Sequence, residues 1–140
     1  MKLKIKKTNP AAIIPKYAYD DDAAFDLFSV ETITIEPGAR VQIPTGIAMQ
    51  IPTGHVGMIW DKSGLSHNFG LKVMGGVIDS GYRGEIKVGM INLSDEPYTV
   101  EKGHKITQMV IQQKETCEIE EVSELEESHR GTSGFGSSGK

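Results

Sequence analysis

The sequence predicts an all-β protein assembled from many short strands. Isoleucine and valine together number 24 of its 140 residues, against six leucines, and β-branched side chains are enriched in strands. Sixteen glycines and six prolines fall largely between the apolar runs, where short strands need turns. A chain of this length can bury one substantial core, so we expect a single domain.

The charge and the cysteine count exclude several classes of protein. A net charge of −4 and an isoelectric point near 5.5 argue against a general nucleic-acid binder, which carries a basic face. A single cysteine cannot form an intrachain disulfide. The chain starts without an apolar signal segment, and no apolar run approaches the ~20 residues that cross a bilayer. We therefore expect a cytoplasmic, soluble protein with neither nucleic acid nor membrane as a partner.

The first strands are indicated by alternation of apolar and polar residues. Leu3 and Ile5 stand between lysines, as in a strand with one solvated face. The segment 8–19 contains two prolines and is expected to be an irregular connection. Two further pairs of alternating runs, 32–44 and 47–60, each surround a turn with proline and glycine, and we predict both to be hairpins.

Asp26 is a carboxylate placed between two apolar residues, Phe25 and Leu27. On a strand with buried neighbours, such a carboxylate needs a partner, which can be a cation, an amide or a bound water. The nearby run of three aspartates, 20–22, admits a metal site, but a solvated loop is the simpler interpretation.

Lys62, Ser63 and Gly64 follow directly on a predicted strand. Their backbone N–H groups, a hydroxyl and an ammonium charge together suit an anion such as phosphate. Taken alone, this tripeptide is more simply interpreted as a surface turn. Residues 66–69 are predicted to form a short helical turn.

The stretch 75–85 predicts a hairpin whose turn contains a carboxylate. Val77 and Ile78 lead into a turn that starts at Asp79, and Tyr82 opens a second β-rich run. The glycines of this stretch permit backbone conformations that a Cβ forbids, and they allow a planar ligand to approach closely. For this stretch alone, Asp79 has a simpler role as a turn former.

Further strands are predicted at 86–93 and 106–112, and a last one in the acidic segment 115–127. That segment holds seven glutamates, and its alternating apolar residues indicate a strand with an acidic outer face. The composition then changes to glycine and serine, which is typical of a flexible arm. Arg130 and Phe135 offer a phosphate fork and an aromatic plate, which favours a functional arm over the remnant of an expression tag.

Five stretches of the chain, in this order, resemble the motifs of trimeric dUTP pyrophosphatases (dUTPases), and the resemblance runs from about residue 3 to residue 139. An ordered set of five motifs is more specific than any single glycine-rich loop. The stretches are AAFDL at 23–27, KSGL at 62–65, GVIDSGYRG at 76–84, GHKITQM at 103–109 and RGTSGFGSSG at 130–139.

The resemblance implies a jelly-roll-like β-barrel of the β-clip type, forming a homotrimer with an exchanged C-terminal strand and arm. It divides the chain into a barrel, residues 1–128, and an arm, residues 129–140, that closes over the nucleotide. Each active site then draws its motifs from three subunits. The implied reaction is the hydrolysis of dUTP to dUMP and pyrophosphate with Mg²⁺, which limits uracil in DNA and supplies dUMP for thymidylate synthesis.

The resemblance also implies roles for individual residues. Asp79 activates the water that attacks the α-phosphorus, Asp26 lies near Mg²⁺ and contacts it through water, and the Tyr82 ring leaves no room for a 2′-hydroxyl. The uracil is received by the backbone of Gly75, Gly76, Val77 and Ile78, with Lys87 on the far side of its pocket. The residues that hold the phosphates or close the arm are Lys62, Ser63, Gly64, Gln108, Arg130, Phe135, Gly136 and Ser137.

Five positions depart from the family's usual pattern, and two of them, Ala24 in place of glycine and Phe25 in place of the frequent tyrosine, are small changes. Lys62 stands where arginine is usual, and a lysine cannot hold phosphate bidentately. Asp61 stands where proline is usual and adds a like charge near the expected phosphates. Gly81 replaces a commoner aspartate beside the sugar. Triphosphate affinity is the property that the changes at Asp61 and Lys62 affect most, whereas Gly81 leaves the roles of the other residues unchanged.

Two rival functions are compatible with the same fold. A dCTP deaminase has a similar Ile-Asp hairpin, but it requires a glutamate near the position of Gly89, and the segment 88–93 contains no carboxylate. A non-catalytic nucleotide-binding or regulatory module would have no need of Asp79, so the presence of this residue favours the enzyme.

Overall fold

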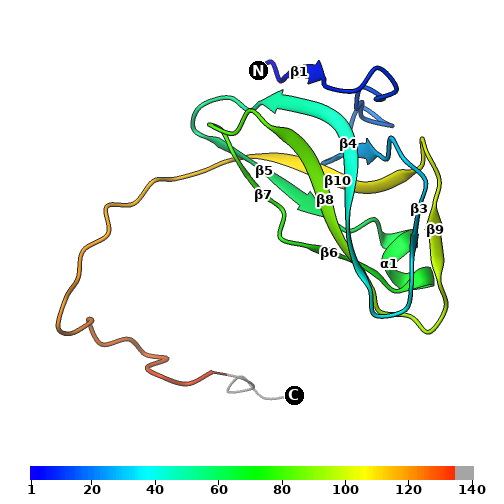
Figure 1. Ribbon diagram of the computed structural model, residues 1–140. Coiled ribbons are helices and arrows are strands. Elements are labelled where there is room, and N and C mark those ends of the chain that lie inside the picture. The colour runs from blue at the N-terminus through cyan, green and yellow to red at the C-terminus, as the bar shows by residue number, and fades with distance from the viewer. Residues whose placement is uncertain (135–140) are drawn as a thin grey trace.

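The computed structural model describes residues 1–134, which form ten strands and one short helix (Figure 1). The helix, α1 (Ser63–Phe69), lies between the fifth and sixth strands. The strands are β1 (Lys4–Lys7), β2 (Phe25–Phe28), β3 (Ile33–Ile35), β4 (Arg40–Gln50), β5 (His55–Trp60), β6 (Leu71–Met74), β7 (Val77–Asp79), β8 (Glu85–Asn92), β9 (Tyr98–Val100) and β10 (Lys105–Gln113).

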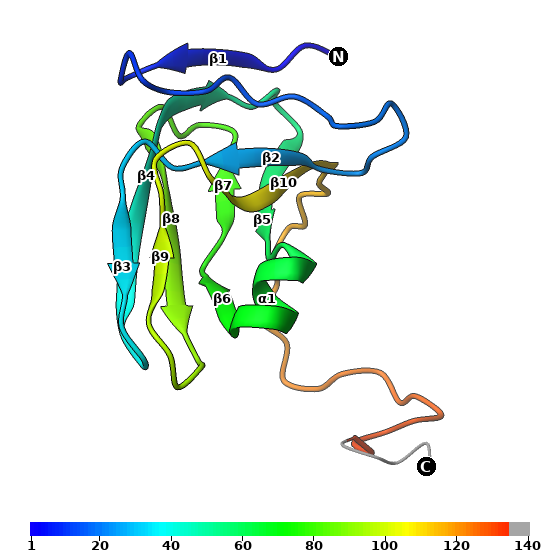
Figure 2. The same cartoon turned by 90° about the vertical axis from the view of Figure 1, so that its right-hand side faces the viewer.

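Two four-stranded antiparallel sheets enclose the core. One has the strand order β1-β4-β8-β6 and the other β2-β10-β5-β7, while β3 and β9 form a separate pair. Figure 2 shows the β3–β9 pair beside β4 and β8, with β2, β10, β5 and β7 in the second layer. Side chains from both sheets, such as Ile43 and Val88 on one and Leu27 and Met109 on the other, are fully buried in one apolar cluster. The all-β prediction is confirmed.

The strands of the predicted hairpins are present, but the prediction that each strand pairs with the next one along the chain is wrong. β3 pairs with β9 and not with β4, β4 pairs with β1 and β8, and β5 pairs with β10 and β7. β7 and β8, at the two ends of the predicted 75–85 hairpin, also belong to different sheets. Among the described strands, none pairs with the next one along the chain, because every connection passes from one sheet to another. The turn residues locate the reversals, whereas burial of both apolar faces selects the partners.

Helix α1 begins at the corner after β5 and ends at Gly70. Gly70 has a φ of 66°, and its N–H donates to the oxygen of Ser66 at 3.1 Å, which caps the helix. A Cβ at Gly70 would lie 3.0 Å from the backbone nitrogen of Ser94, so both conformation and space require glycine. The helical turn predicted at 66–69 is confirmed, and the helix starts earlier, at Ser63.

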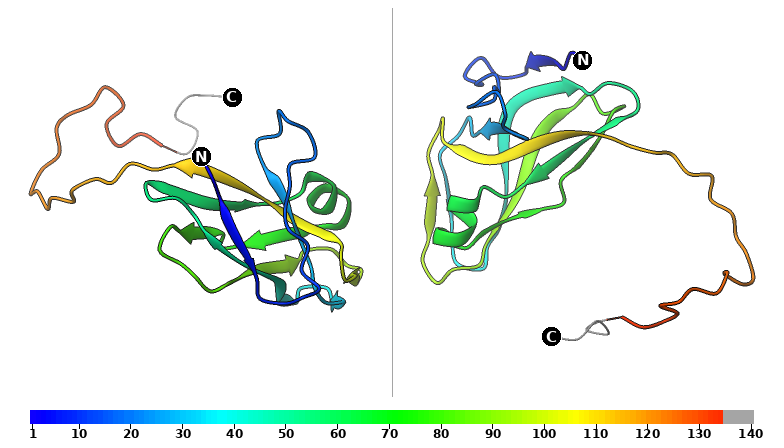
Figure 3. Two further views of the ribbon diagram at one scale, coloured as in Figure 1. Left: turned by 90° about the horizontal axis from the view of Figure 1, so that it is seen from above. Right: turned by 180° about the vertical axis from the view of Figure 1, so that it is seen from behind.

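After β10 the chain leaves the barrel as an extended tail, drawn in orange and red in Figures 1 and 3. Residues 114–134 contain neither strand nor helix, so the strand predicted within 115–127 is not formed inside this chain. An extended segment needs a neighbouring strand for its backbone hydrogen bonds, and the described residues supply none to the tail. The apolar side chains of the tail are exposed, Ile119 to 95% and Leu125 to 87%.

Three residues that we assigned to the closing arm, Phe135, Gly136 and Ser137, lie outside the described residues. Within residues 1–134, the structure has no helix of the length and apolar character needed to span a membrane.

Candidate active site

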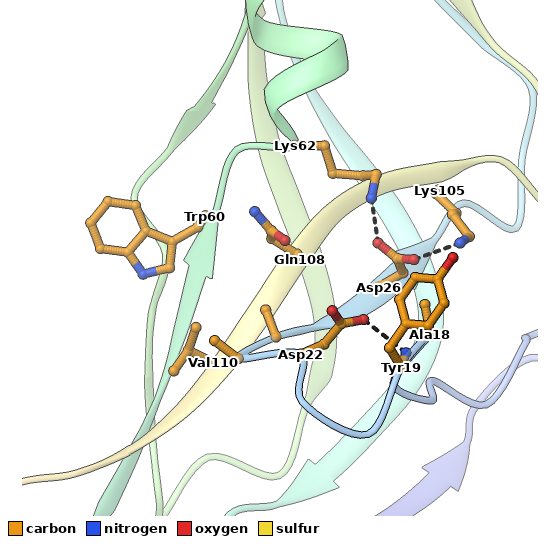
Figure 4. Close-up of a pocket in the computed structure, with 11 residues that line it drawn as sticks. Ala18, Tyr19, Asp22, Asp26, Trp60, Lys62, Lys105, Gln108 and Val110 are labelled. Carbon is orange, nitrogen blue, oxygen red and sulfur yellow. Dashed lines mark hydrogen bonds and ion pairs between the residues drawn. The ribbon is translucent and has the colours of Figure 1, made fainter.

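The carboxylate of Asp26 lies at the centre of a group of charged side chains (Figure 4). Asp26 is in β2, and its neighbours Phe25 and Leu27 are buried in the core. Its Oδ1 accepts a hydrogen bond from Lys62 Nζ at 2.5 Å, and its Oδ2 lies 2.7 Å from Lys105 Nζ. The Asp26 carboxylate is therefore paired with two lysine ammonium groups.

The two lysines control the ionisation of Asp26. Burial would raise the pKa of the Asp26 carboxyl, but the hydrogen bonds and charges of Lys105 and Lys62 outweigh burial, and the pKa lies below its usual value of 3.8. The hydrogen bond to Asp26 raises the pKa of Lys105 in return. Two ammonium groups and one carboxylate leave this group with a net positive charge.

Lys105 is a residue that the sequence analysis missed, although it lies in the fourth motif. It belongs to β10, where the register places it opposite Phe28 of β2. Its contact with Asp26 is therefore a diagonal contact between neighbouring strands. The polar and apolar pattern of a single strand carries no signal for such a contact.

A cavity of about 530 Å³ opens beside this charged group. Ammonium, carboxylate, amide and aromatic groups line it, contributed by Lys62, Lys105, Asp22, Asp26, Gln108, Trp60 and Tyr19 (Figure 4). Gln108 is held in place because its Nε2 donates to the backbone oxygen of Asp61 at 2.8 Å. The two ammonium groups and the two carboxylates balance in formal charge, and the lysine ammonium groups and the fixed amide are donors that suit the oxygens of a polyphosphate.

Ser63 and Gly64 form the first turn of α1, directly after Lys62. Lys62 occupies the position before the helix in an extended conformation, with φ −83° and ψ 124°, and its side chain does not cap the helix. Ser63 and Gly64 are exposed, and a Cβ on Gly64 would meet nothing within 4 Å. The N–H groups of this turn and the Ser63 hydroxyl are thus accessible to an anion next to Lys62.

Asp61 does not direct its charge toward the cavity, contrary to the expectation of a like charge near the phosphates. Its Oδ1 accepts a hydrogen bond from the Val73 N–H at 2.6 Å, and its Oδ2 pairs with Lys72 Nζ at 2.6 Å. Asp61 therefore ties the end of β5 to β6, and Lys72 compensates its charge. Asp61, which stands where the family usually has proline, therefore has a structural role and does not repel phosphate in the cavity.

The stretch 75–79 presents its backbone next to an exposed carboxylate. Gly76 has a φ of 115°, and a Cβ there would lie 2.9 Å from the Ile59 oxygen, so no side chain fits. The Ile59 N–H donates to the Gly76 oxygen at 2.8 Å, which fixes the stretch on β5. Val77 is 64% exposed, and Asp79 is exposed at the end of β7.

Tyr82 is folded back over the return turn. Its N–H donates to the Asp79 oxygen at 3.1 Å, and its hydroxyl donates to the Glu85 oxygen at 3.1 Å. The ring covers Gly84, where a Cβ would lie 2.6 Å from the Tyr82 Cζ atom. These contacts hold the Tyr82 ring over Gly84 and tie the Tyr82 backbone to Asp79.

One chain presents two part-sites and does not bring all predicted residues together. Asp26, Lys62 and Gln108 line the cavity, whereas none of the described residues 75–82 does. Lys87 does not line the cavity; it lies on the exposed side of β8, in a hollow that it shares with Gln42 and Thr8. Arg130 lies in the tail, where its Nε donates to the oxygen of the nearby Ser133 at 2.9 Å.

The described residues do not fit a metal ion ligated directly by the protein. Both oxygens of Asp26 already accept from ammonium groups. Among residues 1–134, no cluster of three histidine, cysteine, aspartate or glutamate side chains is placed to bind a metal. The aspartates 20–22 likewise form no such cluster.

Replacing Asp26 by asparagine tests the electrostatic contribution of this group to stability. Because the folded-state pKa of Asp26 is lowered, its stabilisation is fully present above the usual value of 3.8 and is lost as the pH falls through the folded-state pKa. We expect Asp26→Asn to lower the free energy of unfolding by about 1.5 kcal/mol at about pH 7, the low end for hydrogen bonds to charged groups, because both lysines contact water.

Urea unfolding in metal-free buffer, at about pH 7 and about pH 3, measures this difference. The difference in the free energy of unfolding between wild type and Asp26→Asn should be smaller at the lower pH. The exposed Asp20→Asn is the matched control and should follow wild type at both. An equal difference in the free energy of unfolding at the two pH values would contradict a stabilising role for the Asp26 charge.

Comparisons with known proteins agree with this geometry. A model of the dUTPase family matches residues 10–139. The deoxyuridine 5'-triphosphate nucleotidohydrolase of Clostridium novyi (strain NT) is 50% identical, with 99% of each chain covered. That of Nautilia profundicola is 48% identical, with 100% of each chain covered.

Two solved structures of phage enzymes are similar to this fold. The Staphylococcus bacteriophage 80alpha dUTPase with dUPNHPP has a TM-score of 0.93 at 33% identity, covering 99% of both chains. The D95N mutant of the dUTPase from phage phi11 of S. aureus has a TM-score of 0.83 at 28% identity, covering 89% of this chain and 98% of that one. The phi11 structure is described as showing the coordination of a structural Mg(II) ion.

Proposed function

The chain belongs to the dUTPase family, and on this premise we propose that it hydrolyses dUTP to dUMP and pyrophosphate in the cytoplasm. The observation that carries the proposal is the exposed Asp79 at the end of β7, directly after a backbone that Gly75 and Gly76 leave without side chains. Such a reaction limits the uracil available to DNA and supplies dUMP for thymidylate synthesis.

The base is bound by the backbone of residues 75–78. A planar uracil can approach this stretch because neither Gly75 nor Gly76 carries a Cβ, and its N–H and C=O groups can pair with the base edge. Tyr82, held over Gly84, lies against the deoxyribose and leaves no room for a 2′-hydroxyl. We place Lys87, on the exposed side of β8, at the far side of the base pocket.

Asp79 is the general base of the reaction. It accepts a proton from a water molecule while the water oxygen bonds to the α-phosphorus, and the bond from that phosphorus to the bridging oxygen breaks. The leaving pyrophosphate is held by the cavity group, Lys62, Ser63, Gly64 and Gln108, together with Arg130 of the arm. Lys62 moves from Asp26 to phosphate with little loss of charge balance, because Lys105 remains on Asp26.

Mg²⁺ is the cofactor that we propose, arriving with the nucleotide. When bound, it neutralises charge on the phosphate oxygens. Asp26 would contact it only through water, because both of its oxygens are held by lysines. The protein's own residues therefore contribute no direct ligand among those described.

The complete site is assembled from three subunits of a homotrimer. Two features support this: the described residues 75–82 do not line the cavity that holds Asp26 and Lys62, and the tail exposes Ile119 and Leu125 with no partner strand among residues 1–134. β1, at the edge of its sheet, carries lysines that complement the glutamates of the tail. In this arrangement the barrel, residues 1–128, exchanges its acidic strand with a neighbour, and the arm, residues 129–140, closes over a site on another subunit.

The structure of β8 weighs against the deaminase rival. A Cβ at Gly89 would lie 2.9 Å from the Met74 oxygen, so a glutamate does not fit there without a backbone shift.

An activity assay distinguishes the proposed enzyme from a non-catalytic nucleotide-binding module. Pyrophosphate release from dUTP, compared with dCTP, dTTP and UTP, should be fast for dUTP alone. Absence of release from dUTP would contradict the proposed function.

The trimer is tested by mass and by complementation. Light scattering should give about 46 kDa, three times the chain mass of 15.3 kDa. Asp79→Asn and Lys62→Met chains should each be poorly active alone, and co-folding them should restore activity, because some mixed sites combine an intact Asp79 with an intact Lys62. A stable, active monomer of 15.3 kDa, or a lack of complementation, would contradict the shared site.

A further inference from the structure

Glu85, the first residue of β8, ties this strand to a bulge in β4. Its Oε1 accepts a hydrogen bond from the Gly46 N–H at 2.8 Å. Next to it, the Thr45 hydroxyl donates to the Ile86 oxygen at 2.6 Å. Both bonds lie where the β4–β8 register shifts. They take the place of ladder hydrogen bonds that the bulge interrupts.

Gly46 is a rigid anchor for the Glu85 carboxylate. Its φ is 66°, and a Cβ there would lie 2.8 Å from the side chains of Asn9 and Val30. Its oxygen accepts hydrogen bonds from the N–H groups of Thr8 and Asn9, at 2.8 and 3.1 Å. Gly46 is buried, so its N–H depends on Glu85 for an acceptor.

The backbone of Glu85 in turn holds Tyr82. The Tyr82 hydroxyl donates to the Glu85 oxygen at 3.1 Å, and the ring rests on Gly84 between them. The Tyr82 N–H reaches back to the Asp79 oxygen. The orientation of the tyrosine ring therefore depends on a residue whose own position is set by Gly46, on the other strand.

We propose that Glu85 is a positioning residue that orients Tyr82 and so sets the selectivity for deoxyribose over ribose. The inference rests on the proposed function, in which the Tyr82 ring lies against the sugar. Without the carboxylate, the buried Gly46 N–H loses its acceptor and the start of β8 shifts. The Glu85 oxygen moves with it, and the tyrosine ring tilts away from the space of a 2′-hydroxyl.

The test is the ratio of kcat/KM for dUTP to kcat/KM for UTP. Glu85→Ala should lower this ratio by about tenfold or more, the effect of one unsatisfied buried donor. Glu85→Gln keeps an acceptor oxygen at the same distance and should retain a nearly wild-type ratio. The exposed Glu36→Ala is the control and should leave the ratio unchanged. If Glu85→Ala does not fold, Glu85→Asp, which is one methylene shorter, takes its place with the same expectation.

A double-mutant cycle with Tyr82→Phe separates positioning from general stability. Because Glu85 acts through the tyrosine hydroxyl, the effects of Glu85→Ala and Tyr82→Phe on the ratio should not add. Additive effects, or an unchanged ratio in an otherwise active Glu85→Ala or Glu85→Asp variant, would overturn the inference alone. A wild-type protein that does not hydrolyse dUTP would overturn the proposed function, and the inference with it.

Discussion

Asp79→Asn is expected to bind a non-hydrolysable dUTP analogue as wild type does and to lose at least ~100-fold in turnover, the usual contribution of a positioned base. Asparagine has the same size and keeps an oxygen that can hold water, but it cannot accept the proton. Asp79 is exposed at the end of β7, so the substitution leaves the core unchanged. The loss should therefore appear in kcat and not in analogue affinity.

The measurement is pyrophosphate release at saturating dUTP, together with a dissociation constant for the analogue. Asp95→Asn removes another exposed carboxylate, from the β8–β9 connection, and serves as the control. Turnover of Asp79→Asn close to that of the control would show that another group takes the proton.

The positions of most strands could be predicted from the sequence, but the pairing between strands could not. Alternation around Ile43 and Val88 indicates two strands because period-two burial is a local property of each. The partner of β3, however, is β9, more than 60 residues away. Proline and glycine at the ends of β3 and β5 specify where the chain turns, but not the sheet to which it goes next. That choice depends on which apolar faces meet in the core.

The same limit applies to the candidate site. The need of Asp26 for a partner was predictable, since Phe25 and Leu27 are apolar on either side of it. The identity of the partner was not, because Lys105 reaches Asp26 across β2 and β10. Asp61 shows the converse: its carboxylate turns to β6 and binds Lys72, so a charge that is near in sequence is absent from the cavity.

The second large effect that we expect follows from removal of the arm. Truncation after His129 should leave the fold and the assembly intact, because β10 ends at Gln113 and residues 130–134 are exposed. Turnover should fall by ~100-fold or more, the usual effect of removing one preorganised donor from a developing charge. The truncation removes Arg130, which we place on the phosphates, and Phe135, which we place over the nucleotide.

A shorter truncation after Ser138 is the matched control, since it removes only Gly139 and Lys140 and should retain full activity. Phe135→Ala should lower turnover while the melting temperature without ligand stays unchanged. Ordering each arm residue costs on the order of 1 kcal/mol, and only contacts with nucleotide can offset this cost. The arm should therefore resist proteolysis with a bound dUTP analogue and be cleaved without it. Full activity after truncation at His129 would show that the tail is a passive extension and that the site is complete without Arg130.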